Sequence, residues 1–173
     1  MWDQKTWERP TASGYGKQVP GDAYFRAGVG LLVSNPAKHV LALERIDVPG
    51  SWQAPQGGIG EGEEPRAAAE RELYEETRIP WEAVDLVDEH PQWLAYELPA
   101  HARSKKTGLG QVQKWFLLHY RGSDANIRLD TGGDEKEFAG WRWMPMGHLV
   151  SAVWEVRRPV YQDLALRWKD HFA

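Results

Sequence analysis

Cysteine is absent from this chain of 173 residues, and its absence removes several chemistries at once. Disulfide bonds, thiolate metal sites and a cysteine nucleophile are all excluded. Long apolar runs are also missing, because runs such as AGVGLLV at 27–33 fall far short of the roughly 20 residues that a membrane-spanning helix needs. The opening stretch, MWDQKTWERP, contains no apolar signal core. We therefore expect a cytoplasmic protein that is neither exported nor bound to a membrane.

An excess of basic residues is absent as well. The sequence has 21 Lys and Arg against 25 Asp and Glu, a formal charge of −4, so at long range the chain repels a polyanion. A substrate that carries phosphates would therefore need local cations or metal ions. Hydrophobic residues make up 42% and charged residues 27% of the chain, as in an ordinary soluble domain. The length fits one compact domain, which we expect over 23–173 after an irregular N-terminal extension over 1–22.

Short apolar segments separated by Gly and Pro predict a chain rich in strands, with two helices. Pro65 suits the first position of a helix that continues to about Thr77. A second, amphipathic helix is expected over 160–172, where Val160, Leu164 and Trp168 recur every four residues. The segment HARSKKTGLG at 101–110 reads as a loop. The predicted strand segments are AGVGLLVSN (27–35), HVLALERI (39–46), SWQAPQGG (51–58), VDLVDEHPQWLAYEL (84–98), VQKWFLLHYRG (112–122) and FAGWRWMPM (138–146).

Three glutamates gather on one face of the first predicted helix. Each helical residue advances about 100°, so Glu72, Glu75 and Glu76 fall within an arc of roughly 100°, while Glu70 points nearly the other way. The ordinary explanation of such a cluster is a solvated acidic face, because like charges at this spacing destabilise an exposed helix by only about 0.2–0.5 kcal/mol per pair. The flanking sequence decides whether that explanation holds.

The flanking residues complete a longer pattern. Gly57, five residues, Glu63, seven residues and then RELYEETRI at 71–79 resemble the box of the Nudix hydrolases, G-x5-E-x7-R-E-U-x-E-E-x-G-U, with U aliphatic. Segments outside the box, YFRAGVG, SWQAPQGGI, GQVQKWFLL and EFAGWRW, resemble the branch that contains bacterial RNA pyrophosphohydrolases and diadenosine polyphosphate hydrolases. The resemblance implies one α/β domain, a Nudix α/β/α sandwich around a mixed sheet.

The resemblance also implies a metal site. Mg²⁺ and Mn²⁺ prefer oxygen ligands, which carboxylates one helical turn apart can supply. Two or more ions would be held by carboxylates of the box, by the carbonyl oxygen of Gly57 and by a glutamate from outside the box; these residues are Gly57, Glu72, Glu75, Glu76 and Glu137. Glu135 and then Asp134 are the alternatives to Glu137. The water proton would be taken by Glu76 or Glu137.

Several further residues have roles that the resemblance implies. Glu63 and Arg71 would form an ion pair behind the metal ligands and orient them, so that Arg71, like Glu75, supports catalysis. Arg26 and Arg45 resemble cations that contact terminal phosphates, and Lys114 is a weaker third candidate. Each of the three could instead be an ordinary exposed side chain on a strand.

The expected substrate is the 5′-triphosphate or 5′-diphosphate end of RNA, from which pyrophosphate or phosphate is released. A dinucleoside polyphosphate such as diadenosine tetraphosphate is the alternative substrate. A nucleotide-binding module without activity would be expected to lose box carboxylates, and all are present. Aromatic side chains could stack on bases, with Trp52, Trp115, Trp141 and Trp143 as candidates, although large aromatics more often fill cores. Cations that could meet a downstream phosphate are Arg103, Lys105, Lys106, Arg157 and Arg158. No obligate protein partner is expected.

One position departs from the box. Arg78 stands where the pattern has glycine near the end of the helix. That glycine is expected to adopt the left-handed conformation of a helix C-cap, which costs a non-glycine residue about 1 kcal/mol. We therefore expect Arg78 to be left-handed and strained.

Overall fold

The computed structural model describes residues 24–129 and 136–173. Tyr24 is thus the first residue described, and the predicted extension over 1–22 lies outside the described part of the chain. Glu135 and Asp134, the alternatives to Glu137, also lie outside it. Among the described residues, no helix has the length and apolar character that crossing a membrane requires.

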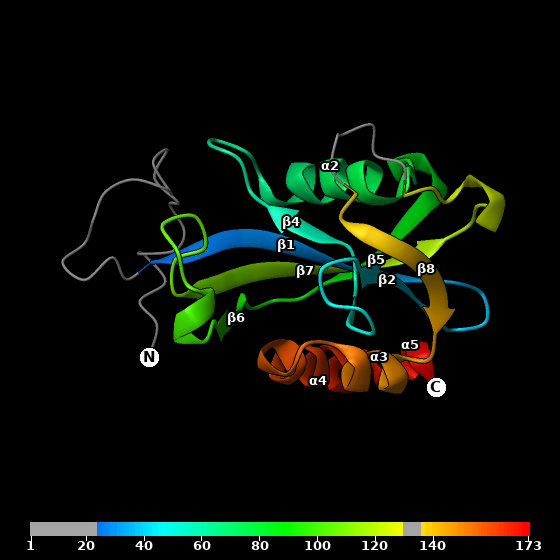
Figure 1. The fold of residues 1–173 in the computed structure, drawn as a ribbon. Coiled ribbons are helices and arrows are strands. Elements are labelled where there is room, and N and C mark those ends of the chain that lie inside the picture. Colours follow the sequence, from blue (N-terminus) through cyan, green and yellow to red (C-terminus); the bar gives the residue numbers. More distant parts are fainter. Residues whose placement is uncertain (1–23, 130–135) are drawn as a thin grey trace.

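A mixed sheet of eight strands forms the middle layer (Figure 1). Its centre is a long parallel pair, in which Phe25 lies opposite Gly110 and Ser34 opposite His119. The other strand pairs are antiparallel. The strands are β1 (Phe25–Ser34), β2 (Val40–Arg45), β3 (Trp52–Gln53), β4 (Gln56–Gly58), β5 (Val84–Glu89), β6 (Leu94–Glu97), β7 (Gly110–Tyr120) and β8 (Phe138–Met144).

Helices cover both faces of this sheet, which gives three layers (Figure 1). Helix α2 (Pro65–Thr77) packs on one face through Ala68, Ala69 and Leu73. On the other face lie α3 (Met146–Ala152), α4 (Arg158–Arg167) and α5 (Lys169–Phe172). Each face has its own apolar core. The predicted α/β/α sandwich is therefore confirmed.

Three predicted elements are wrong in detail, one of them the strand expected over 84–98, which is divided into β5 and β6. The segment SWQAPQGG forms two short strands, β3 paired with β2 and β4 paired with β1. Pro55 interrupts them because it has no N–H for a ladder, and its carbonyl accepts a bond from the N–H of Leu31 at 2.9 Å. The helix expected over 160–172 begins at Arg158 and breaks at Trp168, whose φ of −107° and ψ of 25° are not helical.

Helix α3 was not predicted at all. It has seven residues, too few to show a helical period in the sequence. Burial of Met146 and Leu149 in the core stabilises it. Such short helices depend on tertiary packing more than on intrinsic propensity.

Arg78 adopts the predicted left-handed conformation, with φ of 60° and ψ of 14°. Its N–H donates to the carbonyl of Tyr74 at 2.9 Å and so caps the end of α2. Its guanidinium carbon lies 5.3 Å from the centroid of the Tyr74 ring. A cation–π contact at an exposed site contributes about 0.5–1 kcal/mol, which offsets part of the backbone strain.

Two substitutions of Arg78 separate the strain from the ring contact. Arg78→Ala removes the contact with Tyr74 and keeps the strain, whereas Arg78→Gly removes both. We expect the glycine variant to have a free energy of unfolding about 1 kcal/mol above that of the alanine variant. Denaturant unfolding of both proteins measures this difference, and equal stabilities would contradict a left-handed residue 78.

Candidate active site

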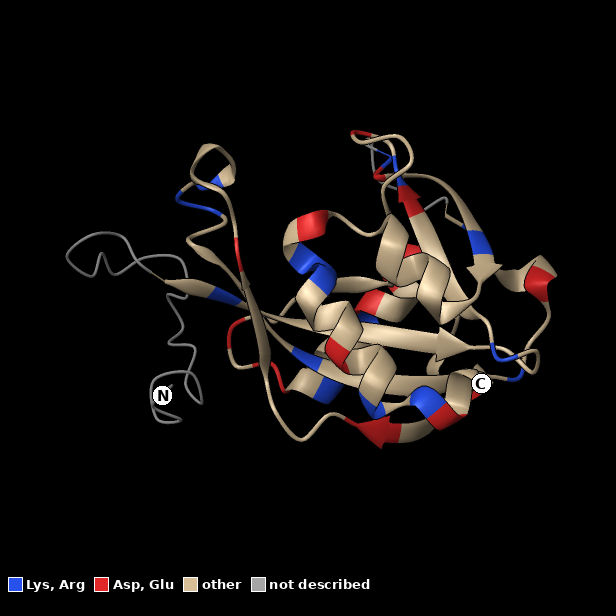
Figure 2. Cartoon of the chain, turned by 90° about the horizontal axis from the view of Figure 1, so that it is seen from below, with Lys and Arg blue, Asp and Glu red and all other residues tan. Residues whose placement is uncertain are grey.

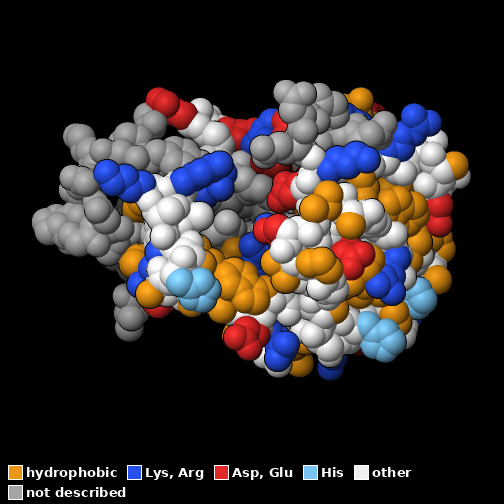
Figure 3. All heavy atoms as spheres, viewed as in Figure 1, with side chains coloured by type: hydrophobic (Ala, Val, Ile, Leu, Met, Phe, Trp, Pro, Cys, Tyr) orange, Lys and Arg blue, Asp and Glu red, His pale blue; other side chains and the backbone are white. Residues whose placement is uncertain are grey.

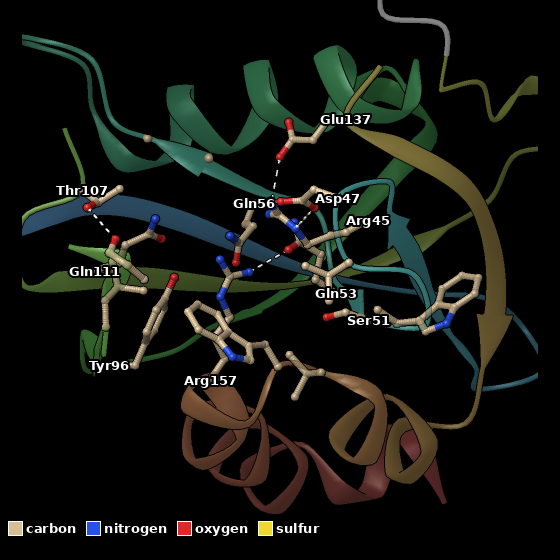
Figure 4. A pocket seen from close by; sticks show the side chains of 18 of the residues that line it. Arg45, Asp47, Ser51, Gln53, Gln56, Tyr96, Thr107, Gln111, Glu137 and Arg157 are labelled. Carbon is tan, nitrogen blue, oxygen red and sulfur yellow. Dashed lines mark hydrogen bonds and ion pairs between the residues drawn. The ribbon is translucent and has the colours of Figure 1, made fainter. Parts of the chain in front are cut away.

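A pocket of about 600 Å³ opens between helix α2 and the C-terminal helices (Figure 4). Its acidic wall contains Glu72 and Glu76 from α2 and Glu137, which precedes β8. Its other wall contains Tyr96, Trp154 and Arg157. Figure 3 shows acidic and basic side chains close together near the middle of this face. The pocket can therefore offer cations to one part of a ligand and carboxylates to another.

Arg71 joins the loop before α2 to the helix. Its Nε and Nη2 donate to the two carboxylate oxygens of Glu63 at 2.8 and 2.9 Å, and Nη2 also donates to the carbonyl of Gly58 at 2.8 Å. Its Nη1 donates to Glu72 at 2.7 Å and to Glu75 at 3.1 Å. The hydrogen bonds from Arg71 hold the pKa of Glu63 below its usual value. This arrangement is the predicted Glu63–Arg71 pair, extended to two box carboxylates.

Glu72 approaches the backbone of Gly57 very closely. A Cβ atom on Gly57 would lie 1.8 Å from the carboxyl carbon of Glu72. Only glycine therefore leaves room for this carboxylate beside the strand. Burial raises the pKa of Glu72, although its hydrogen bond from Arg71 acts in the opposite direction.

Glu76 is the most deeply placed of the carboxylates, with 7% of the residue exposed. Its Oε2 accepts the N–H of Gln56 at 2.9 Å. Burial raises its pKa well above the usual value, and repulsion from Glu137 and then from Glu72 adds to this. A divalent cation would relieve both effects because it stabilises the ionised forms.

The remaining two acids are more exposed. The Glu75 side chain is 53% exposed and is held by Arg71 rather than lining the pocket. The Glu137 side chain is 57% exposed and lies 3.8 Å from Nη1 of Arg45. Among the described residues, no three His, Asp or Glu side chains converge closely enough to hold an ion as they stand. Binding an ion through all of the predicted ligands would therefore require some of these side chains to move.

Two of the three predicted phosphate contacts line the pocket. The guanidinium of Arg26 covers Gly58, where a Cβ atom would lie 2.4 Å from its Nη2. Arg45 donates to both oxygens of Asp47, at 2.8 and 2.6 Å. These bonds raise the pKa of Arg45 and lower that of Asp47. Arg45 is thus held in a fixed orientation at the edge of the pocket (Figure 4).

Lys114 lies outside the pocket lining. Its Nζ is 3.0 Å from Oε1 of Glu89. Successive side chains of a strand point to opposite faces of a sheet, and Gln111 and Gln113 of the same strand face Gln56 beside the pocket. Lys114 therefore projects from the other face, and the structure does not bring it to the other predicted site residues.

Arg157 lies in the wall opposite the acids and is 8% exposed. Its Nη1 donates to Oε1 of Gln53 at 2.7 Å. Its guanidinium carbon is 5.2 Å from the Tyr96 ring centroid and 6.0 Å from that of Trp154. Sequence reasoning named Arg157 only as a downstream cation and missed Gln53, Tyr96 and Trp154. The signal for Gln53 was its place in SWQAPQGGI, whereas nothing in the local pattern marks Tyr96 or Trp154.

Three of the four tryptophans suggested for base stacking lie away from the pocket lining. Trp115 is fully buried in the core, and Trp141 and Trp143 pack against the core on the α2 side. Trp52 lines the pocket, but Arg142 lies 3.8 Å from its ring centroid. Trp154 is therefore the better placed aromatic side chain.

The basic loop also differs from expectation. Arg103 donates to the carbonyl of Leu98 at 2.7 Å and lies 3.5 Å from Glu97. Its guanidinium thus holds the loop to β6 instead of extending into solvent. Lys105 and Lys106 are exposed, and Thr107 reaches the pocket lining.

Replacing Gly57 by alanine tests the close approach of Glu72. The added Cβ would displace the carboxylate by an ångström or more, and misplacement on that scale lowers catalysis by about 100-fold. Gly140→Ala is the matched control, because a Cβ there meets nothing within 4 Å. Steady-state kinetics on folded protein gives the comparison, and equal kcat/KM for the two variants would contradict the packing described.

Comparisons with known proteins agree with this geometry. Residues 24–164 match the family model described as the NUDIX domain. The chain is 42% identical over 158 residues to a protein of Cereibacter sphaeroides named RNA pyrophosphohydrolase, covering 89% of this chain and 96% of that protein. A protein of the same name from Rhodospirillum rubrum is 41% identical over 143 residues, covering 81% and 84%.

A solved structure has the same fold. The dihydroneopterin triphosphate pyrophosphohydrolase of E. coli superposes with a TM-score of 0.66 at 23% identity, over 84% of this chain and 99% of that one. At this identity the likeness supports the fold alone. The family match, which covers most of the chain, and the identity to the two relatives lead to one conclusion: the chain belongs to the Nudix family.

Proposed function

We propose that this protein is a metal-dependent hydrolase that removes pyrophosphate or phosphate from the 5′ end of RNA. The observation that carries the proposal is the pairing of two walls in one pocket, the acids Glu72, Glu76 and Glu137 facing Tyr96, Trp154 and Arg157. The identity to relatives named RNA pyrophosphohydrolase supports the same substrate. A phosphoanhydride would lie against the acids and a nucleotide against the aromatic wall.

The donor set of the acidic wall fits hard divalent cations. Nudix hydrolases generally use Mg²⁺ or Mn²⁺. Bound ions would supply charge neutralisation of the phosphates and activation of a water molecule. The groups that would hold them are the carbonyl oxygen of Gly57 and the carboxylates of Glu72, Glu75, Glu76 and Glu137.

The two candidates for the general base differ in their surroundings. Glu76 is buried and fixed by the N–H of Gln56, which suits a carboxylate that holds an ion in place. Glu137 is more than half exposed, so a proton that it accepts can pass to bulk water. We therefore assign the proton-accepting role to Glu137 and an ion-holding role to Glu76.

Cations of the pocket would bind the phosphates. Arg26 lies against Gly58, and Arg45 is oriented by Asp47. Arginine suits this role because its guanidinium binds phosphate through two parallel hydrogen bonds. Asp47 thus acts as a positioning residue for Arg45.

The aromatic wall would contact the nucleotides. Stacking of a base on an aromatic side chain contributes about 1–3 kcal/mol and tolerates any base. Trp154 offers such a surface, whereas the Tyr96 ring is 5% exposed and packs against Arg157, which offers a cation. RNA presents a second nucleotide and a phosphodiester to this wall.

Removing the charge of a box carboxylate should abolish most of the activity. We expect Glu75→Gln and Glu76→Gln each to lower kcat by about 100-fold or more, since each loses a group that would hold an ion at the reacting phosphate. Glu70→Gln is the control, because Glu70 is exposed on the same helix and points away from the pocket. Near-normal turnover by both variants, or full activity of the wild type in excess EDTA, would refute the proposal.

A substrate panel distinguishes RNA from a dinucleoside polyphosphate. We expect a triphosphorylated RNA of two or more nucleotides to be hydrolysed faster than diadenosine tetraphosphate or ATP at matched concentration. Trp154→Ala should raise KM for RNA several-fold, because it removes a stacking surface. Faster hydrolysis of diadenosine tetraphosphate by the wild type would assign the activity to that alternative.

A further inference from the structure

A second hollow lies at the C-terminal end of helix α2. Its volume is about 370 Å³, and its lining consists of Tyr74, Arg78, Asn126 and Arg128. Tyr74 and Arg78 come from the end of the helix, and the other two come from η3 (Asp124–Asn126) and the residues after it. In Figure 1, η3 is the unlabelled yellow-green turn to the right of α2, beyond the C-terminal end of that helix. None of the four residues lines the catalytic pocket.

The charged side chains that line this second hollow are both basic. The lining combines the guanidinium groups of Arg78 and Arg128 with the amide of Asn126 and the Tyr74 ring, and it includes no carboxylate. Tyr74 is 49% exposed, an unusual state for a large aromatic residue. Guanidinium groups bind phosphate, and exposed aromatic rings bind bases by stacking. The set of side chains thus matches the two chemical parts of a nucleotide.

Arg128 forms no ion pair with a described acidic residue, as is also true of Arg66, Arg142 and Arg158. Within residues 24–129 and 136–173, its guanidinium is therefore available to a ligand; Figure 2 marks the basic and acidic positions along the chain. The arginines that pair with acids are Arg45, Arg71, Arg103, Arg121 and Arg167. The backbone N–H of Arg128 donates to the carbonyl of Thr77 at 2.9 Å, which fixes this segment against the end of α2.

Arg78 keeps a strained conformation beside this hollow. Its φ of 60° would be relaxed by glycine, yet the position carries a long cationic side chain over the Tyr74 ring. Backbone strain of this kind is concentrated at binding and catalytic sites. A cation at a helix C-terminus also interacts favourably with the helix dipole. The helix dipole can explain a cation at position 78, but it explains neither the cation at position 128 nor the exposed ring of Tyr74.

We propose that this second hollow binds the phosphate of a nucleotide between Arg78 and Arg128, with its base against Tyr74. The phosphate can come from a downstream phosphodiester of the RNA substrate or from a free nucleotide. Tyr74 projects about 200° around the helix from Glu72, so the two sites are separated by roughly one helix diameter, about 10 Å. The RNA source rests on the proposed function, whereas the free-nucleotide source does not.

Binding is tested on the full chain by NMR, with AMP and inorganic phosphate as the probes. We expect the backbone amide signals of Asn126 and of residue 128 to shift on addition of AMP to the wild type, and this shift to be lost in Arg128→Gln and partly kept in Arg128→Lys. Arg66→Gln is the matched control, because Arg66 is another cation of α2 that lies 5.8 Å from the Trp81 ring, outside the hollow. Unmoved signals with both probes, or equal shifts in wild type and Arg128→Gln, would overturn the proposal.

Kinetics then identifies the source of the phosphate. If it is the RNA strand, Arg128→Gln should raise KM several-fold for a triphosphorylated RNA of about ten nucleotides and reduce the salt slope of binding by about one. KM for a triphosphorylated RNA dinucleotide, which is too short to reach the second hollow, should stay unchanged. If it is a free nucleotide, AMP binding is lost and KM is unchanged for both RNAs. Failure of all RNA hydrolysis would refute the proposed function, and the NMR titration would still decide this site.

Discussion

The confinement of negative charge on one side of helix α2 is the constraint on which the rest of the site depends. Glu72 and Glu76 are buried against the sheet, and burial raises the pKa of both. Two unit charges about 5 Å apart repel by roughly 3 kcal/mol at an effective dielectric near 20. Arg71 compensates part of this repulsion by binding Glu72 and Glu75 while its other edge holds Glu63. The remaining imbalance makes the pocket a place where a divalent cation would be stabilised.

The sandwich brings distant parts of the chain to this charge. The long parallel pair β1–β7 carries Arg26 and the glutamines beside the pocket, and the α4 side of the sheet supplies Trp154 and Arg157. The carboxylates and the aromatic wall thus come from opposite layers. A ligand that extends across both would contact acids at one end and a stacking surface at the other, as a phosphoanhydride attached to a nucleotide would.

Much of this could be predicted from local sequence. Pro65 and the spacing of the box predicted where helix α2 begins and ends. Because the box has glycine at the position of Arg78, it also predicted the left-handed backbone of this residue. The opposite wall could not be predicted, because Tyr96 and Trp154 are distant in sequence and reach the pocket only through the packing of α4 on the sheet. The position of Lys114 could not be predicted either. The face of the sheet from which its side chain projects depends on the alignment of the strands, which residue type does not reveal.

The most direct test of the confined charge is the pH dependence of stability without metal. Because folding raises the pKa of Glu76, the folded chain keeps this proton to higher pH than the unfolded chain. Protonated Glu76 therefore contributes fully to the stability of the fold below its ordinary pKa of about 4.5. This contribution is lost as the pH rises through the raised pKa of the folded chain. Glu76→Gln cannot titrate, so its free energy of unfolding should exceed that of the wild type at neutral pH and approach it in acid, and added Mg²⁺ should stabilise the wild type selectively. A metal-free Glu76→Gln protein less stable than the wild type at neutral pH would contradict the account.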